Sequence, residues 1–559
     1  MHSKRGLCFC ATLVGALAAS AGAIDAADLP RPVAHWKFAG TAEDSGADHL
    51  STSAIGVDFV DDGMLFPKAG LFKGHGEHLA VDAGRTLDFG AGDFSAALWV
   101  RTDGGIDDSG DLLSQFDHDK RTGWTLSLRS NAGVTNSQVD VRQLQFGIDN
   151  GTEPVFTDEG RPGNSLYGFS MAVLDGNLYV GTCEPRSEEK GRVYRYSRPT
   201  MDLPPRWIDC GAPDEANSIS SMAVYEGQLY VGSAKYRLGG SSLPEAENLQ
   251  PGGKIFRMKK PGEWEFCGRL EGAEAVGGMV VFGGQLYATS LYAPAGFFRY
   301  EGNTEWTRLE SPEGKRTQAM TVFDGALWAT SYDNGHIYRF DGKRWSDLGP
   351  LEANTQNYSF AAYRGQLYVG SWPSGKVYRW AGEGRWEDTG RLGQELEVMG
   401  MLVHNGSLYA GTLPLAELYR FDGDGKWSRL RQLDETPDVK YRRVWTAATF
   451  QGKSFWTTLP SGHIHSLQAG TATSWDSAFP TGWQHISAVR AKDRLRLYVG
   501  GRQVSESDAF NPARMRLTNS ASFTIGRGPG ASFRGRMADV RVYREALTPE
   551  QVGELAKRP

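Results

Sequence analysis

Residues 364–371 read Arg-Gly-Gln-Leu-Tyr-Val-Gly-Ser, and this pattern decides the fold because it recurs along the middle of the chain. Each copy has a turn that contains glycine and then a strand of the type Leu-Tyr/Trp-Val/Ala-Gly/Thr-Ser/Thr. Asp-Gly and Asn-Gly pairs suit a two-residue hairpin turn, since glycine tolerates positive φ. The copies lie at 175–182, 226–233, 284–290, 324–331, 364–371, 405–412 and, in degenerate form, 451–458.

Each copy continues with a third strand that carries an aromatic-Arg pair, such as Tyr378-Arg379, and then with a tryptophan that marks a fourth strand. Four short strands in about 40 to 50 residues are typical of one propeller blade. The pattern therefore predicts a β-propeller over 153–476 with seven blades, or six if the degenerate last copy does other work. It resembles kelch-like propellers. The marker tryptophans are Trp207, Trp264, Trp306, Trp345, Trp386, Trp427 and, in the last copy, Trp475.

The segments on either side of the repeats, 28–152 and 477–559, do not repeat. Asp93–Arg101 reads DFSAALWVR, Gly482–Arg490 reads GWQHISAVR, and Asp539–Tyr543 reads DVRVY. These stretches resemble the two halves of one laminin-G or concanavalin A-like jelly roll. The resemblance implies an all-β chain in which one jelly-roll sandwich is split by an inserted β-propeller. Neither half could bury both sheet faces alone, so we expect the halves to pair around the insertion.

The N-terminus reads as a secretory signal peptide over residues 1–27. Lys4 and Arg5 precede an apolar run from Gly6 to Ala19, and small residues follow. That order is typical of a cleaved signal and the run is short for a membrane span. We therefore expect a secreted, periplasmic or extracellular protein with no membrane span. The net charge of -6 over 559 residues gives no reason to expect nucleic acid as a partner.

Three cysteines follow the signal segment: Cys183, Cys210 and Cys267. Their spacing matches no zinc pattern. Cys210 and Cys267 occupy equivalent points of neighbouring repeats, which splay apart, so a disulfide between them is not expected. A Cys183–Cys210 bridge stays open, and small buried hydrophobic side chains are the favoured interpretation.

Propellers usually bind ligands at one mouth of the central channel. In this repeat the innermost strand precedes the glycine turn, so its start can be aligned by counting back. The aligned column is Tyr167, Ser218, Ala275, Arg316, Gln356, Glu397 and Arg443, and its neighbours include Asn217, Glu274, Tyr358, Arg442 and Trp445. These aromatic, amide and charged groups suit sugar hydroxyls or an acidic sugar, with Arg316, Arg442 and Arg443 able to hold a carboxylate. The alternative is a solvated rim with internal salt bridges. The next column, Met171, Met222, Met279, Met320, Phe360 and Met401, indicates packing between blades.

The jelly roll offers a second candidate site. Concanavalin-like domains often bind Ca²⁺ through loop carboxylates. Asp44 and Asp539 match positions that can be metal ligands in such domains, and Asp48 could assist. A plain Asx turn explains Asp44 equally well. Ca²⁺ in a structural role is the only cofactor expected.

No catalytic constellation has a recognisable spacing. Sialidases also join propellers to concanavalin-like domains, but Ser331–Tyr338 (SYDNGHIY) lacks the Thr-Trp that ends their turn motif, and their early Arg-Ile-Pro motif is absent. The sequence therefore favours a binding protein for glycans or other cell-surface ligands, a protein ligand included, without enzymatic activity. The alternatives are a carbohydrate-active enzyme with its site in the propeller channel, and a structural or adhesion protein of the cell envelope.

Overall fold

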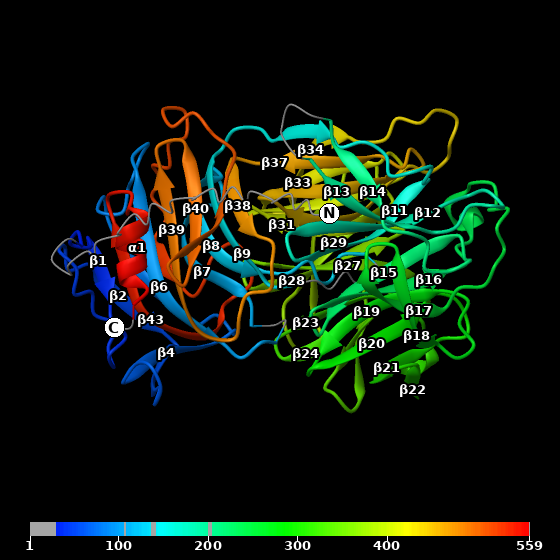
Figure 1. Cartoon of the computed structure of the whole chain (residues 1–559), viewed down its shortest axis with the longest axis horizontal. Helices are drawn as coiled ribbons and strands as arrows, with labels where there is room; N and C mark the ends of the chain where they lie inside the picture. The colour runs from blue at the N-terminus through cyan, green and yellow to red at the C-terminus, as the bar shows by residue number, and fades with distance from the viewer. Residues whose placement is uncertain (1–28, 106–107, 136–140, 199–203, 558–559) are drawn as a thin grey trace, which may run out of the picture.

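The structure is a computed structural model that describes residues 29–105, 108–135, 141–198 and 204–557. The expected signal peptide lies outside these residues. Two bodies lie side by side: strands from both ends of the chain form one, and the middle of the chain forms the other (Figure 1). No helix in the described ranges is long and apolar enough to cross a membrane.

The first body is a sandwich of two antiparallel sheets. One sheet has the order β3 (Asp58–Asp61), β4 (Lys68–Lys73), β43 (Arg534–Tyr543), β6 (Phe94–Thr102), β39 (Gly482–Ala491), β40 (Arg494–Val499), β41 (Arg502–Glu506), with β1 (Ala34–Trp36) paired to β43. The other has the order β2 (Ser51–Ile55), β5 (His78–Asp82), β42 (Phe523–Ile525), β7 (Gly110–Asp117), β8 (Thr122–Arg129), β9 (Gln143–Asn150), β38 (Thr471–Trp475). A short helix, α1 (Pro549–Leu555), ends the described chain.

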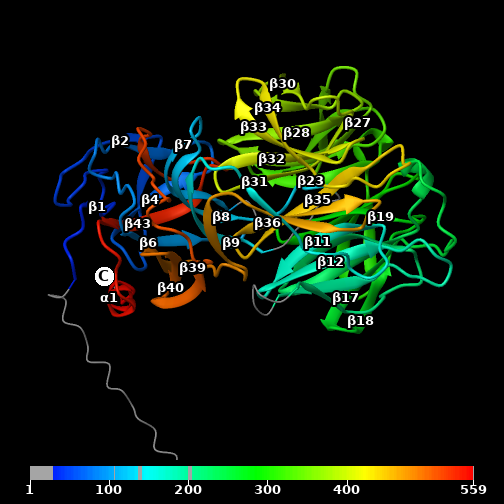
Figure 2. The ribbon, with the colours of Figure 1, turned by 90° about the horizontal axis from the view of Figure 1, so that it is seen from above.

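The two flanking segments build this sandwich together. Strand β6 pairs with β39 along its whole length, from Phe94 opposite Arg490 to Thr102 opposite Gly482. Strand β9 pairs with β38 in the same way in the other sheet. Each sheet therefore combines strands from the N-terminal and the C-terminal segment, coloured blue to cyan and orange to red (Figure 2). Ala96, Leu98 and Val100 of β6 alternate toward the shared core, as the period of two predicts. The expected fold class, an all-β chain with a split jelly roll and a propeller, is confirmed.

The second body is a ring of four-stranded antiparallel groups, seven of them within the described ranges. The innermost strands are β11 (Tyr167–Leu174), β15 (Ser218–Tyr225), β19 (Val276–Phe282), β23 (Thr317–Phe323), β27 (Gln356–Tyr363), β31 (Glu397–His404) and β35 (Arg443–Phe450). The second strands are β12 (Asn177–Cys183), β16 (Gln228–Ala234), β20 (Gln285–Ser290), β24 (Ala326–Ser331), β28 (Gln366–Trp372), β32 (Ser407–Leu413) and β36 (Lys453–Leu459). Successive innermost strands touch around the ring, and β35 closes it against β11.

The outer strands complete each group. The third strands are β13 (Val193–Ser197), β17 (Lys254–Lys260), β21 (Phe297–Gly302), β25 (His336–Phe340), β29 (Lys376–Trp380), β33 (Glu417–Gly423) and β37 (Ile464–Gln468). The fourth strands are β14 (Arg206–Asp209), β18 (Glu263–Arg269), β22 (Glu305–Leu309), β26 (Trp345–Pro350), β30 (Trp386–Arg391), β34 (Lys426–Gln432) and β10 (Val155–Asp158).

The recurring tryptophans tie neighbouring groups together. The indole N–H of Trp207, for example, donates to the Glu159 carbonyl of the preceding group at 2.9 Å, and Trp264 does the same to Cys210 at 2.9 Å. The column of Met171 and its equivalents is buried between groups, as expected. The three cysteines are buried free thiols, so the hydrophobic interpretation is confirmed.

Trp475 was expected to mark the fourth strand of the last repeat, and this prediction is wrong. Trp475 lies in β38, which pairs with β9 of the jelly roll. The fourth strand is instead β10, from before the first repeat, with Val155 opposite Gln468. One group is thus built from both ends of the propeller segment, which closes the ring with strand pairing.

The jelly roll docks on the end of the ring that carries the hairpin turns between first and second strands. We call this end the turn mouth, and the opposite end, where the innermost strands begin, the start mouth. Asn405, in the turn after β31, donates to the carbonyls of Ile148 at 2.9 Å and Ala469 at 2.7 Å. The sheet of β7, β8 and β9 lies between the other jelly-roll sheet and the propeller (Figure 1). The propeller therefore covers the outer face of that sheet.

Candidate ligand-binding site

The predicted column lies at the start mouth. Tyr167, Ser218, Gln356, Glu397 and Arg443 are the first residues of their innermost strands. Ala275 and Arg316 directly precede β19 and β23. Counting back from the glycine turn therefore located one end of the ring correctly, within one residue in every group.

Five of the predicted residues meet there, and we call them the channel cluster: Tyr167, Tyr358, Glu397, Arg443 and Trp445. The Tyr167 and Trp445 rings have centroids 5.4 Å apart, and the Arg443 guanidinium lies 5.7 Å from the Trp445 ring centre. Arg443 faces Glu397 with a nitrogen–oxygen distance of 3.8 Å. No member is more than 6% exposed, so these residues are not a solvated rim.

A cover lies over the channel cluster. It is the segment 235–253 between β16 and β17, which we call the cover loop. Tyr236 and Leu238 of this loop belong to the same buried cluster as Tyr167 and Trp445. The Tyr236 ring lies 5.6 Å from Tyr167. The extra length of the second repeat in the sequence is this loop, which closes the start mouth.

Two predicted ligand-binding residues hold the cover loop in place. The Asn217 amide accepts from the Tyr236 backbone N–H at 2.8 Å and donates to its carbonyl at 3.0 Å. Glu274 pairs with Arg237 of the loop at 3.1 Å, on the exposed side. Asn217 and Glu274 therefore position the cover loop.

The three arginines do not converge. Arg316 pairs with Asp333, donating from Nε at 2.9 Å, and it stacks over the Tyr332 ring at 4.8 Å. Arg442 donates to the Thr436 carbonyl at 2.6 Å. Only Arg443 points into the channel cluster, where it donates to the Ser241 hydroxyl of the cover loop at 2.6 Å. The structure does not form a joint carboxylate clamp from these three residues.

The electrostatics of the channel cluster are set by burial. Burial raises the pKa of the Glu397 carboxyl, against the opposing effect of Arg443. Within the channel cluster, three buried polar atoms have no hydrogen-bond partner among the described residues: the Tyr167 hydroxyl, Glu397 Oε1 and Arg443 Nε. Leaving such an atom unpaired costs about 1–3 kcal/mol. Unpaired donors and acceptors gathered at one point mark a place that polar groups of a ligand or water would complete.

The predicted calcium ligands already have separate partners within the protein. Asp44 accepts from the backbone N–H groups of His35 at 2.6 Å, Gly46 at 2.7 Å and Leu50 at 2.8 Å, which is the role of an Asx turn. Asp539 pairs with His35 at 2.6 Å and with Arg541 at 2.8 Å. Asp48 is exposed. Ca²⁺ at this loop stays a prediction.

The jelly roll reaches into the channel from the turn mouth. The carbonyl of Gly133, in the loop after β8, accepts from the Phe360 N–H in the middle of β27 at 2.7 Å. The Asn131 side chain accepts from Thr449 N–H at 2.8 Å, and Val134 packs in the propeller core. The channel is therefore closed from both ends by the chain itself.

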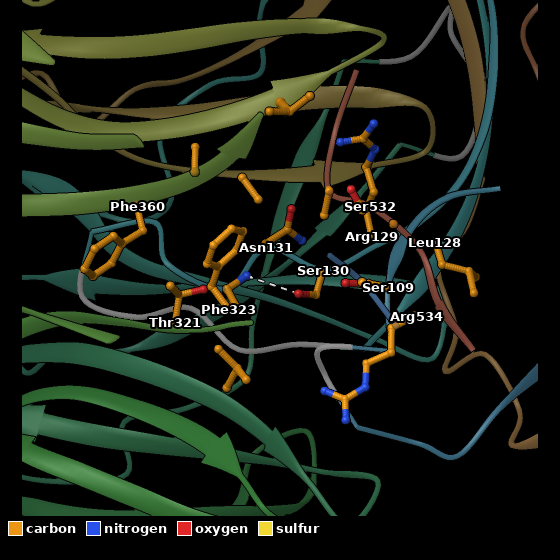
Figure 3. Close-up of a pocket in the computed structure, with 18 of the residues that line it drawn as sticks. Ser109, Leu128, Arg129, Ser130, Asn131, Thr321, Phe323, Phe360, Ser532 and Arg534 are labelled. Carbon is orange, nitrogen blue, oxygen red and sulfur yellow. Dashed lines mark hydrogen bonds between the residues drawn. The ribbon is translucent and has the colours of Figure 1, made fainter. Parts of the chain in front are cut away.

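A cavity of about 120 Å³ remains between the two bodies (Figure 3). Arg129, Ser130 and Asn131 reach it from the jelly roll, and Thr321 and Phe360 from the propeller. The Arg129 guanidinium is paired with Asp111 at 2.7 Å. The cavity has room for several waters but is smaller than the roughly 300–1,000 Å³ of small-molecule sites. The start mouth is the better candidate because unpaired polar atoms and aromatic rings converge there.

Sequence reasoning missed the aromatic residues that enlarge the site. Tyr236 comes from the cover loop, and Tyr292 and Tyr332 come from the segments after β20 and β24. The only signal in the sequence was the unusual length of the second repeat.

Comparison with known proteins supports a lectin-like jelly roll in part of the chain. Residues 422–553 match the family model of the concanavalin A-like lectin/glucanases superfamily. A comparison with curated proteins gives no match.

Among solved structures, a virginiamycin B lyase from Staphylococcus aureus is 14% identical, with a TM-score of 0.42, covering 56% of this chain and 99% of its own. The extracellular domain of a putative hybrid two-component system from B. thetaiotaomicron is 10% identical, with a TM-score of 0.40, covering 63% and 47%. These scores carry no argument about activity. The strand pairing shows a jelly roll with a β-propeller inserted into it, and the family match shows that residues 422–553 are similar to concanavalin A-like lectins and glucanases.

Proposed function

We propose that this protein is an exported recognition protein that binds a glycan in the channel cluster of its propeller. A jelly roll of the lectin type fits a binding role. The observation that carries the proposal is the convergence of Tyr167, Glu397 and Arg443, each with a buried polar atom that has no partner among the described residues.

The chemistry of the cluster suits a sugar. Trp445 and Tyr358 offer aromatic faces for the apolar face of a sugar ring. Glu397 and Arg443 offer an acceptor and charged donors for hydroxyl or carboxylate groups. An apolar wall with a few convergent polar groups is the general character of ligand sites.

The cover loop must move before a ligand can enter. Its side-chain contacts to the ring near the channel cluster are those of Asn217 with Tyr236, of Arg443 with Ser241, and of Arg237 with Glu274 on the exposed side. Farther along the loop, the Asn248 amide donates to the carbonyls of Glu189 and Glu215 at 2.8 Å. Binding in the channel cluster is therefore coupled to opening of this loop.

Export is part of the proposal. It rests on the basic, apolar and small-residue order of residues 1–27. The lectin-type jelly roll fits an extracellular location.

Binding of the full chain to a glycan and polysaccharide panel tests the proposal, with Ca²⁺ and with chelator, while released sugar is assayed in the same wells. Glu397→Gln keeps size and removes the charge, and should weaken binding about tenfold or more. Glu395→Gln is the matched control: Glu395 is also buried, but it accepts from Leu415 N–H outside the channel cluster. Equal effects of the two variants, or no binding at all, would overturn the proposal. Released sugar would favour the enzyme alternative.

A further inference from the structure

An ion pair recurs at the outer edge of several propeller groups. The residue at or just before the start of the third strand places a basic side chain against an acid of the fourth strand. Arg192 pairs with Asp209 at 2.6 Å, Lys376 with Asp388 at 2.7 Å and His463 with Asp158 at 2.9 Å. His336 pairs with Asp347 in the same way at 2.9 Å. These pairs are a feature of the repeat.

Two groups add a glutamate to this pair. In the β27–β30 group, Glu352 lies 3.0 Å from Lys376 and accepts from the Tyr378 hydroxyl at 2.8 Å. The Lys376 ammonium therefore lies between two carboxylates and compensates their charge. Its pKa is accordingly raised by hydrogen bonds to Asp388 and Glu352.

The β23–β26 group has the same two acids but no lysine at the position of Lys376. Glu313 accepts from the Tyr338 hydroxyl at 3.1 Å, as Glu352 does from Tyr378. The imidazole of His336 takes the place of the lysine. One ligand atom from each of Glu313, His336 and Asp347 lies within 4.8 Å of the others, and no other such group occurs in the part of the chain that the structure describes.

The spacing suits coordination of one ion. Ligand atoms bound to one metal at about 2.0–2.2 Å lie about 2.8–3.6 Å apart, from neighbouring octahedral positions to tetrahedral ones. His336 Nδ1 and the Asp347 oxygens are already 2.9 Å apart, so only Glu313 must move closer. Outer partners hold the ligands: Tyr338 donates to Glu313, and Gly349 N–H donates to Asp347 at 2.9 Å.

We propose that Glu313, His336 and Asp347 bind a divalent first-row metal ion, with Zn²⁺ as the best fit to one imidazole and two carboxylates. A cavity of about 460 Å³ lined by Glu313, Tyr338 and Asp347 gives solvent access, so water completes the coordination. Arg299, Lys343 and Arg344 line the same cavity and lower the affinity by repulsion. The site is at the outer edge of the ring and does not depend on glycan binding.

Calorimetric titration of the tag-free full chain with Zn²⁺ alone tests the site. We expect one equivalent bound, and an affinity at least about tenfold weaker in His336→Ala and in Glu313→Gln. His463→Ala is the matched control, because the His463–Asp158 pair has the same geometry without a third carboxylate among the described groups. It should bind Zn²⁺ as the unaltered protein does.

His336→Lys makes the test independent of folding defects. It copies the Lys376 arrangement of the neighbouring group, so it should abolish Zn²⁺ binding while the melting temperature of the metal-free protein is kept. The visible absorption of bound Co²⁺, which reports the geometry of the coordinated ion, should disappear in the same variant. Absence of a one-to-one site, or a site that survives His336→Lys, would overturn the proposal.

Discussion

Arg443 and Ser241 are separated by 202 positions in the sequence and joined by a hydrogen bond of 2.6 Å, from the guanidinium to the hydroxyl. Arg443 opens the innermost strand β35, and Ser241 lies in the cover loop. The floor of the start mouth and its cover are therefore directly bonded. A charged donor makes such a bond stronger than a neutral one.

Ser241→Ala should loosen the cover loop. It removes the acceptor of the Arg443 bond and the contact with the Tyr236 hydroxyl at 3.1 Å. Loss of a bond to a charged group costs about 1.5–3 kcal/mol, so opening should become roughly 10- to 150-fold more frequent. Hydrogen exchange of the amides of 236–246 measures this. Ser242→Ala, at the exposed neighbour, should leave exchange unchanged; equal exchange in both variants would contradict the role of the bond.

His404 should make stability depend on pH. This imidazole is buried at the interface between the two bodies, and burial lowers its pKa from 6.5 to about 3. Between these values the unfolded chain binds the proton and the folded chain does not. The free energy of unfolding is therefore not reduced by His404 above pH 6.5. As pH falls below 6.5, it decreases by about 1.4 kcal/mol per pH unit.

His404→Leu removes this contribution to the pH dependence of stability. Urea unfolding at pH 7, 6, 5 and 4 should show a difference between the native protein and His404→Leu that grows in favour of the variant as pH falls. His75→Leu serves as control, because that side chain is 60% exposed. Parallel pH curves for the native protein and His404→Leu would refute the assignment.

Asn405 should contribute strongly to the stability of the interface between the two bodies. Its amide satisfies two backbone carbonyls, and its φ of 40° is one that glycine also tolerates. Asn405→Gly keeps the backbone and removes the bonds, at a cost of about 2–4 kcal/mol in unfolding free energy. Asn405→Ala should cost about 1 kcal/mol more through backbone strain. A decrease in unfolding free energy below 1 kcal/mol in Asn405→Gly would show that other residues stabilise the interface.

The fold could be predicted because its signals are local and repeated. Glycine turns fix the hairpins, and the tryptophans recur because each indole reaches the neighbouring group. The prediction for Trp475 was wrong because a tryptophan alone does not indicate which sheet its strand joins. The partner of β38 is β9, more than 300 residues away, and no local pattern encodes that pairing.

The candidate site could be predicted in part. Counting from the turns found the strand starts, because strand length is nearly constant. It could not separate Arg443, which points into the channel, from Arg442, which turns to the Thr436 carbonyl, since successive strand residues face opposite sides. The cover loop follows no repeat, so its packing on Tyr167 was outside the reach of the pattern.

Arg443→Met tests whether Arg443 compensates the charge of Glu397 in the channel cluster. The variant leaves Glu397 buried without its cation, and stranding a buried charge costs about 3–5 kcal/mol. Burial already raises the pKa of Glu397, and loss of Arg443 should raise it further, so the carboxyl can take up a proton instead. The unfolded chain releases that proton at ordinary pH, and the cost of Arg443→Met should therefore be larger at pH 8 than at pH 5. In the double variant Arg443→Met with Glu397→Gln, this pH dependence should vanish. Denaturant unfolding at both pH values of the unaltered protein, Arg443→Met, Glu397→Gln and the double variant measures this pH dependence. A loss of unfolding free energy in Arg443→Met that is equal at pH 5 and pH 8 would show that Arg443 does not compensate the charge of Glu397.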